Sequence, residues 1–102
     1  MKKSSVNREK RVENMKLIVV NKQETEFTRE VEDWAREYRS VTGRDVEFVD
    51  PETIDGEIFV KTYDLMQYPA ILVLRDNGIV SAKWAGLPLP QFDEISSHFN
   101  FL

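Results

Sequence analysis

The sequence YPAILVLRDNGIVSAKWAG, residues 68–86, contains the clearest structural signals in the chain. Its first part, Ala70 to Arg75, is a short apolar run rich in branched side chains, which predicts a buried β-strand. Asp76-Asn77-Gly78 follows, and Asn-Gly is the strongest two-residue hairpin signal because both positions tolerate a positive φ. The chain is then expected to return antiparallel from Ile79 to Ala85 and to end this strand at Gly86. The stretch therefore predicts a β-hairpin.

Upstream of the hairpin, the sequence predicts a strand followed by a helix. Residues 16–21, Lys-Leu-Ile-Val-Val-Asn, are apolar on both faces, as expected for a strand covered by helices on both sides. Asn21 with Glu24, or alternatively Thr25, can cap the helix that follows, and Gly43 is placed to end it. The apolar stripe of this helix comprises Phe27, Val31, Trp34, Tyr38 and Val41. We assign Trp34 and Tyr38 to the core.

The remaining elements give weaker signals. Val46 and Phe48 alternate with polar residues within 45–50 and predict a strand. A short helix is expected between Thr53 and Met66, although Gly56 weakens its start; its apolar side would carry Ile58, Phe59, Thr62 and Leu65. A last helical stripe comprises Phe92, Ile95, Phe99 and Leu102. The predicted order is β-α-β-α-β-β-α, an α/β domain with a four-stranded mixed sheet and helices on both faces.

Composition excludes several classes of function. The chain has 102 residues, enough for one domain and one core. It contains no cysteine, which excludes a disulfide framework, a thiolate nucleophile and a cysteine-type zinc site. The single histidine, His98, excludes a histidine-rich metal site and is interpreted as a surface or rim residue. We therefore expect no metal and no cofactor.

Charge divides the chain into a basic extension, residues 1–15, and an acidic domain, residues 16–102. The extension holds five basic and two acidic groups, so its net charge is +3, and the remainder is −7 in a chain of net charge −4. We interpret the extension as flexible or as a short helix. An acidic domain argues against nucleic-acid binding, which needs a basic surface.

Neither a membrane span nor a secretory signal is predicted. No apolar run approaches the ~20 residues that cross a bilayer. The basic start, MKKSSVNREK, is followed by no apolar segment of the kind a signal peptide requires. We expect a cytoplasmic protein that does not insert into membranes.

Four acidic residues lie close together in the middle of the chain, at Asp50, Glu52, Asp55 and Glu57. They do not form a calcium loop. With Gly56 at the obligatory glycine, the ligand positions would include Pro51, and the closing glutamate would be Thr62. We interpret this segment as a solvated acidic turn.

Pro69, the Asn77-Gly78 turn and Gly86 occur in an order and at a spacing that resemble the thioredoxin and glutaredoxin superfamily. The resemblance covers about residues 16–102. It implies a thioredoxin-like domain with a cis peptide bond before Pro69. From the residues alone, Pro69 could equally be the first residue of a strand.

The resemblance also locates the position of the family's Cys-x-x-Cys motif. Thr25-Glu-Phe-Thr28 stands where the two cysteines would lie, with a slip of one or two residues also compatible. Thiol–disulfide exchange requires a thiolate, which threonine cannot supply. In addition, Leu17 to Val20 are all aliphatic where many thioredoxins carry a buried acid. We therefore expect a member without oxidoreductase activity and, more broadly, no enzyme.

Two interpretations of Thr25 and Thr28 remain open. They can simply bond backbone N–H groups at the helix start, or they can belong to an anion or peptide anchor there. The resemblance implies that the cis-proline loop lies against this helix start, where the residue before the proline can pair with an extended peptide. The candidate groove comprises Thr25, Phe27, Thr28, Tyr68 and Pro69, with Trp84 and Gly86 near its rim.

The leading functional hypothesis is a non-catalytic module that binds a protein or peptide through this groove. One alternative is an enzyme that activates glutathione with a hydroxyl group, as glutathione transferases do on this fold with the help of a second, helical domain. The other is a structural or oligomeric role with the groove unused. The sequence specifies neither the partner nor the oligomeric state, because fold does not determine function.

Overall fold

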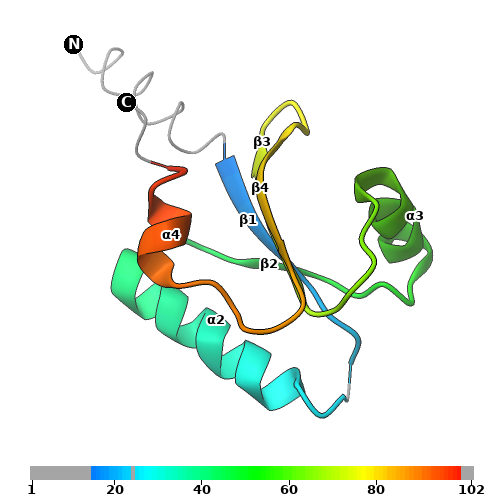
Figure 1. The fold of residues 1–102 in the computed structure, drawn as a ribbon, viewed down its shortest axis with the longest axis horizontal. Coiled ribbons are helices and arrows are strands. Elements are labelled where there is room, and N and C mark those ends of the chain that lie inside the picture. The colour runs from blue at the N-terminus through cyan, green and yellow to red at the C-terminus, as the bar shows by residue number, and fades with distance from the viewer. Residues whose placement is uncertain (1–14, 24, 100–102) are drawn as a thin grey trace.

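The computed structural model describes residues 15–23 and 25–99 (Figure 1). Its elements are β1 (Met15–Val20), α2 (Thr28–Thr42), β2 (Glu47–Val49), α3 (Ile54–Tyr63), β3 (Ala70–Arg75), β4 (Val80–Ala85) and α4 (Phe92–Ser96). The sheet order is β2-β1-β3-β4, with β1 parallel to β2 and the other two pairs antiparallel. The predicted element order and mixed four-stranded sheet are confirmed. Leu102 and the extension before Met15 lie outside the described residues.

The two central strands are apolar on both faces because both faces are covered. Leu17 and Val19 of β1 belong to a core cluster on the side of α2 and α4, whereas Ile18 and Val20 belong to a second cluster on the side of α3. Strand β3 divides its side chains in the same way, with Ile71 and Val73 in the first cluster and Leu72 and Leu74 in the second. Among the described residues, no helix has the length and apolar character needed to span a bilayer.

Helix α2 buries a stripe shifted from the predicted one. Val31, Ala35 and Tyr38 are buried, whereas Val41 is 64% exposed, so its assignment to the stripe was wrong. The small Ala35 is part of the buried stripe, and Val41 lies outside that stripe. Trp34 is half-buried rather than fully buried, and its Nε1–H donates a 3.0 Å hydrogen bond to the Pro90 carbonyl oxygen.

The ends of α2 were predicted with unequal success. Gly43 has a φ of 75° and ends the helix in the left-handed conformation, as predicted. The start differs, because the N-cap residue is Phe27 and it forms no side-chain cap. Neither Asn21 nor Thr25 therefore occupies the N-cap position.

Strand β2 is a three-residue edge strand, shorter than predicted. Val46 is buried, whereas Phe48 is 47% exposed. The predicted alternation of side chains is present. Phe48 is exposed because β2 is the edge strand of the sheet.

Helix α3 contacts the sheet through Phe59, Val60 and Tyr63, which pack against the second core cluster. Ile58, assigned to the buried side, is 59% exposed, and Thr62 is exposed as well. Gly56 has a role that helix propensity did not predict. A Cβ at Gly56 would lie 1.8 Å from the Asp50 carbonyl oxygen, so glycine permits this close approach.

The hairpin forms as predicted, except that β4 begins at Val80 rather than Ile79. Gly78 has a φ of 85°, and the Asn77 side chain accepts a 3.1 Å hydrogen bond from the Ile79 N–H. The last helix is short, but Ile95 and Phe99 are both buried in the first core cluster.

Candidate functional site

Strand register brings the two halves of the predicted groove together. Val20 at the end of β1 pairs with Ala70 at the start of β3, and Ala70 also pairs with Ala85 at the end of β4. The segments that extend beyond these residues therefore meet at one end of the sheet. They are the β1–α2 loop, the Tyr68–Pro69 loop and Gly86.

A surface depression of about 400 Å³ lies at this end of the sheet and is called the Tyr68 depression below. The predicted residues Thr25, Phe27 and Tyr68 all line it. Tyr68 and Phe27 are both half-buried, so each ring keeps part of its surface in contact with solvent. The complete lining is Asn21, Lys22, Thr25, Glu26, Phe27 and Tyr68.

The backbone of the Tyr68–Pro69 loop is hydrogen-bonded at Pro69 but not at Tyr68. The Tyr68–Pro69 peptide bond is cis, and Pro69 is buried. The Pro69 carbonyl oxygen accepts a 2.8 Å hydrogen bond from the Gly86 N–H. In contrast, neither the N–H nor the carbonyl of Tyr68 forms a hydrogen bond with the described part of the chain. A free backbone donor and acceptor thus lie beside the Tyr68 depression.

Thr25 and Thr28 bond to each other and to the backbone. The Thr25 N–H donates to Thr28 Oγ1 at 2.9 Å, and the Phe27 N–H donates to Thr25 Oγ1 at 3.3 Å. The two hydroxyl oxygens are 3.3 Å apart. Within the described residues, no histidine or carboxylate is hydrogen-bonded to either hydroxyl. The hydrogen bonds of the pair therefore organise the start of α2.

Of the two predicted rim residues, Gly86 lies next to the proline loop, whereas Trp84 lines neither depression. Gly86 has a φ of 80° and touches the proline loop, since a Cβ there would lie 2.9 Å from Gln67 Oε1. Trp84 lines neither of the two depressions described here. Its indole packs against the first core cluster and makes an edge contact with His98, with ring centroids 5.8 Å apart.

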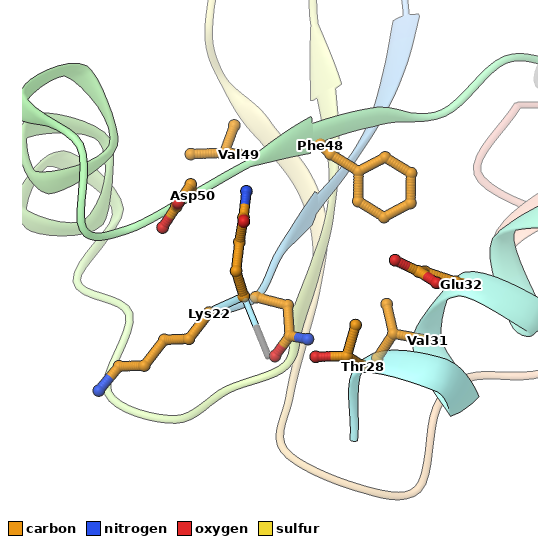
Figure 2. A pocket seen from close by; sticks show the side chains of 9 residues that line it. Lys22, Thr28, Val31, Glu32, Phe48, Val49 and Asp50 are labelled. Atoms are coloured by element: carbon orange, nitrogen blue, oxygen red, sulfur yellow. The ribbon is translucent and has the colours of Figure 1, made fainter. Parts of the chain in front are cut away.

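A second depression, of about 330 Å³, lies between the start of α2 and β2 and is called the β2 depression (Figure 2). Thr28 lines this one rather than the Tyr68 depression. The two depressions share Asn21 and Lys22 and are therefore neighbours. The lining of the β2 depression is Asn21, Lys22, Gln23, Thr28, Val31, Glu32, Phe48, Val49 and Asp50.

The acidic segment after β2 has a structural role in the described chain. Asp50 Oδ1 accepts a hydrogen bond from the Glu52 N–H at 2.9 Å, and Thr53 Oγ1 accepts one from the Gly56 N–H at 3.0 Å. These contacts cap the start of α3. Within residues 15–23 and 25–99, no three His, Asp or Glu side chains are grouped so that they would hold a metal ion.

Solved structures establish the fold. A putative disulphide-isomerase from Bacteroides thetaiotaomicron superposes with a TM-score of 0.65 at 14% identity, over 98% of this chain and 88% of that chain. Thioredoxin O2 from Arabidopsis thaliana gives 0.62 at 9% identity, over 90% and 83%. The germline thioredoxin Deadhead from Drosophila gives 0.57 at 18% identity, over 93% and 88%. The chain has a thioredoxin-like fold.

This similarity establishes the fold alone, so the function has to be inferred from the site. No family model matches the sequence, and no curated protein matches it. Because the sequence contains no cysteine, this thioredoxin-like fold lacks the thiolate that thiol–disulfide exchange requires.

The sequence did not point to Lys22, Glu26, Glu32 or Phe48 as site residues. The three charged side chains belong to runs of polar residues without a distinguishing pattern. The alternation of Phe48 with Val46 predicted a strand and did not mark Phe48 as a site residue. Its exposure depends on how far α2 extends over the sheet edge, which is a tertiary property.

Proposed function

We propose that this chain is a non-catalytic protein that binds an extended segment of a partner protein in the groove beside Tyr68. Its partner is a protein or peptide rather than a nucleic acid, and it acts in the cytoplasm. The free backbone N–H and carbonyl of Tyr68 carry this proposal. An extended peptide can pair with such groups as an added strand, and main-chain hydrogen bonds then supply affinity.

Two aromatic side chains support the same proposal. Phe27 and Tyr68 line the same depression and are both partly exposed. The Lys22 Nζ lies 5.7 Å from the centroid of the Tyr68 ring. A half-buried aromatic ring offers a large, rigid contact surface, and aromatic residues dominate the energetics of many interfaces.

The environment of the two threonines supports a non-catalytic role. Activating a hydroxyl requires an adjacent base or another device that lowers its pKa. Thr25 and Thr28 instead share their hydrogen bonds with each other and with backbone N–H groups. No observation of this site favours a hydroxyl-based enzyme acting on glutathione.

Peptide selection followed by calorimetry tests the proposal. Peptides are selected on an immobilised array of random short sequences, and their affinities for wild type, Phe27→Ala and Tyr68→Ala are then compared. Truncating a central aromatic contact costs about 1–2 kcal/mol, so each variant is expected to bind about five- to thirtyfold more weakly. Circular dichroism verifies that both variants fold.

Ile79→Ala is the matched control, because Ile79 is an exposed apolar residue of the hairpin at the opposite end of β3. It is expected to bind like wild type. If no peptide is selected, or if the aromatic variants bind as tightly as the control, the groove is not a binding site. A structural or oligomeric role is then favoured.

A further inference from the structure

The β2 depression has an apolar floor, of which the Phe48 ring is the exposed part. Of its apolar lining residues, Phe48 is 47% exposed, whereas Val31 is buried and Val49 packs against the second core cluster. The depression adjoins the Tyr68 depression through Asn21 and Lys22, which line both. A segment bound beside Tyr68 can therefore place a neighbouring side chain on this floor.

Glu32 adds a negative charge to this apolar surface. In the view of Figure 2, its carboxylate lies between the Phe48 ring and Val31. The Glu32 carboxylate forms no hydrogen bond or ion pair with the described residues. A carboxylate beside apolar groups thus remains available to a bound molecule.

The other charged groups around the depression are directed elsewhere. Lys22 points away from the remaining lining residues in Figure 2, and its Nζ approaches the Tyr68 ring instead. Asp50 accepts a hydrogen bond from the Glu52 N–H. Arg39, whose guanidinium carbon lies 5.9 Å from the Phe48 ring centroid, donates a 3.2 Å hydrogen bond to Asp45.

We propose that the β2 depression is a subsite for a lysine or arginine side chain of the bound segment. Its methylene groups pack on Phe48, and its charged end lies beside Glu32. This inference rests on the proposed function and specifies the chemistry of the partner. Long basic side chains combine an apolar stem with a charged head, which matches an apolar floor with one carboxylate. An acidic side chain is repelled, and an aliphatic one leaves the Glu32 charge partly desolvated without a partner.

Residue preferences on a peptide array test the subsite. The probe is an immobilised array of short peptides in which every residue type is equally represented at each position, read with wild type, Glu32→Gln and Glu32→Lys. For wild type, lysine and arginine are expected to be enriched about two- to fivefold at one position, as a partly exposed ion pair implies. Glu32→Gln removes this enrichment, and Glu32→Lys replaces it with a preference for acidic residues.

Glu30→Lys is the matched control for charge. Glu30 is an exposed acid of the same helix and does not line the depression. It is expected to keep the basic preference at that position. If Glu30→Lys reduces the preference as much as Glu32→Lys does, the effect is general attraction to an acidic protein, and the subsite is contradicted.

Failure of the subsite and failure of the groove give different results. Peptides that bind without a basic preference, and whose binding depends on Tyr68, contradict the subsite alone. The absence of any bound peptide contradicts both proposals.

Discussion

The Gly86 N–H donates a 2.8 Å hydrogen bond to the carbonyl oxygen of Pro69. This bond joins the end of β4 to the loop that precedes β3. It extends the pairing of Ala70 with Ala85 by one step beyond the sheet. This bond fixes Pro69 to the sheet, whereas the Tyr68 N–H and carbonyl have no hydrogen-bond partner among the described residues.

Gly86→Ala is expected to weaken peptide binding as well as stability. The φ of 80° is in the left-handed region, where a side chain costs about 1–2 kcal/mol. The new Cβ would also lie 2.9 Å from Gln67 Oε1, next to the proline loop. Urea unfolding and peptide titration measure the two effects.

Gly43→Ala provides the comparison for that prediction. Gly43 has a φ of 75°, and a Cβ there would meet nothing within 4 Å. Its loss of stability is expected to be similar, about 1–2 kcal/mol, with peptide affinity unchanged. Equal loss of affinity in both variants would show that destabilisation, and not the position of the proline loop, causes the effect.

Gly56→Ala is expected to destabilise the protein although it replaces glycine within a helix. Helix propensity alone favours alanine by about 1 kcal/mol. Here the Cβ would lie 1.8 Å from a backbone oxygen of Asp50, which cannot move as a side chain can. We expect a net loss of about 1–3 kcal/mol in the free energy of unfolding, as in overpacked cores. A stabilised variant would disprove this close approach.

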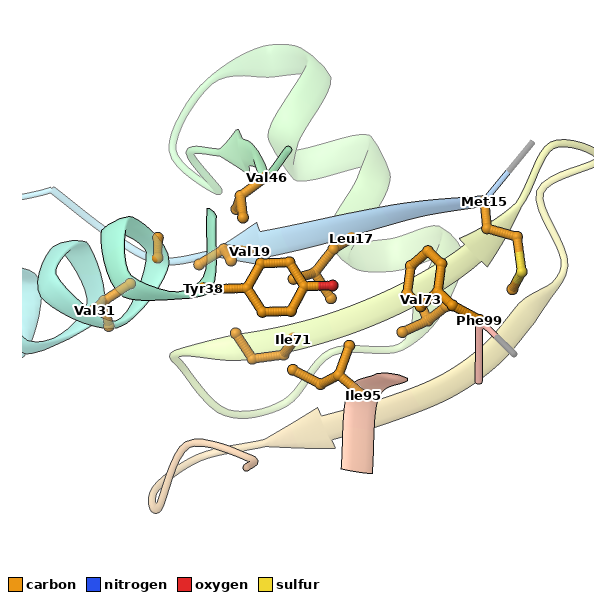
Figure 3. Close-up of a cluster of buried hydrophobic side chains, with 11 residues drawn as sticks. Met15, Leu17, Val19, Val31, Tyr38, Val46, Ile71, Val73, Ile95 and Phe99 are labelled. Atoms are coloured by element: carbon orange, nitrogen blue, oxygen red, sulfur yellow. The ribbon is translucent and has the colours of Figure 1, made fainter. Parts of the chain in front are cut away.

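Tyr38→Phe is expected to leave stability unchanged or to raise it by up to about 1 kcal/mol. The Tyr38 ring lies in the core among Leu17, Ile71 and Ile95 (Figure 3). Its buried hydroxyl has no hydrogen-bond partner among the described residues. Removing an unpaired buried hydroxyl avoids its desolvation cost.

Tyr63→Phe is the control for a tyrosine hydroxyl that is bonded. Its Oη–H donates a 2.9 Å hydrogen bond to the Gly78 carbonyl oxygen, so its loss is expected to cost about 1 kcal/mol. Thermal and urea unfolding compare the two variants. If Tyr38→Phe proves as costly as Tyr63→Phe, the Tyr38 hydroxyl is hydrogen-bonded and the prediction is contradicted.

Thr25→Ala and Thr28→Ala are expected to act as a coupled pair. Each variant removes one bond to a backbone N–H and the contact between the two hydroxyls, and loss of such helix-start contacts costs about 1 kcal/mol. Because both share one network, the double variant is expected to lose less stability than the two single losses combined. Additive losses in a double-mutant cycle would contradict the shared network.

Local patterns were sufficient to predict much of the fold. Two apolar runs, the one before Asn77-Gly78 and the one at residues 16–21, form the central strands. Strands that are buried on both faces appear in a sequence as continuous apolar runs, so their pattern is easy to recognise. Sequence patterns did not predict the burial of side chains whose exposure depends on tertiary packing. Val46 and Phe48 lie on one side of β2, yet only Val46 is covered, since the strand is at the sheet edge.

Part of the candidate site was also predicted, but from the family resemblance and not from local patterns. Thr25, Phe27 and Tyr68 were grouped through the family resemblance, since no periodicity joins residues more than forty positions apart. The register of β1 with β3 brings them to one depression. Glu32 was not identified, because an acidic residue on an exposed helix face has no distinguishing pattern until the shape of the surface is known.

Hydrogen exchange at the Tyr68 amide is the most direct test of the central claim. In the free protein this N–H has no hydrogen-bond partner among the described residues, so it is expected to exchange rapidly. A bound peptide that pairs with it as an added strand is expected to slow its exchange by about tenfold, for a hydrogen bond worth about 1.4 kcal/mol. A peptide that binds while exchange at Tyr68 stays unchanged would contradict recognition through this groove.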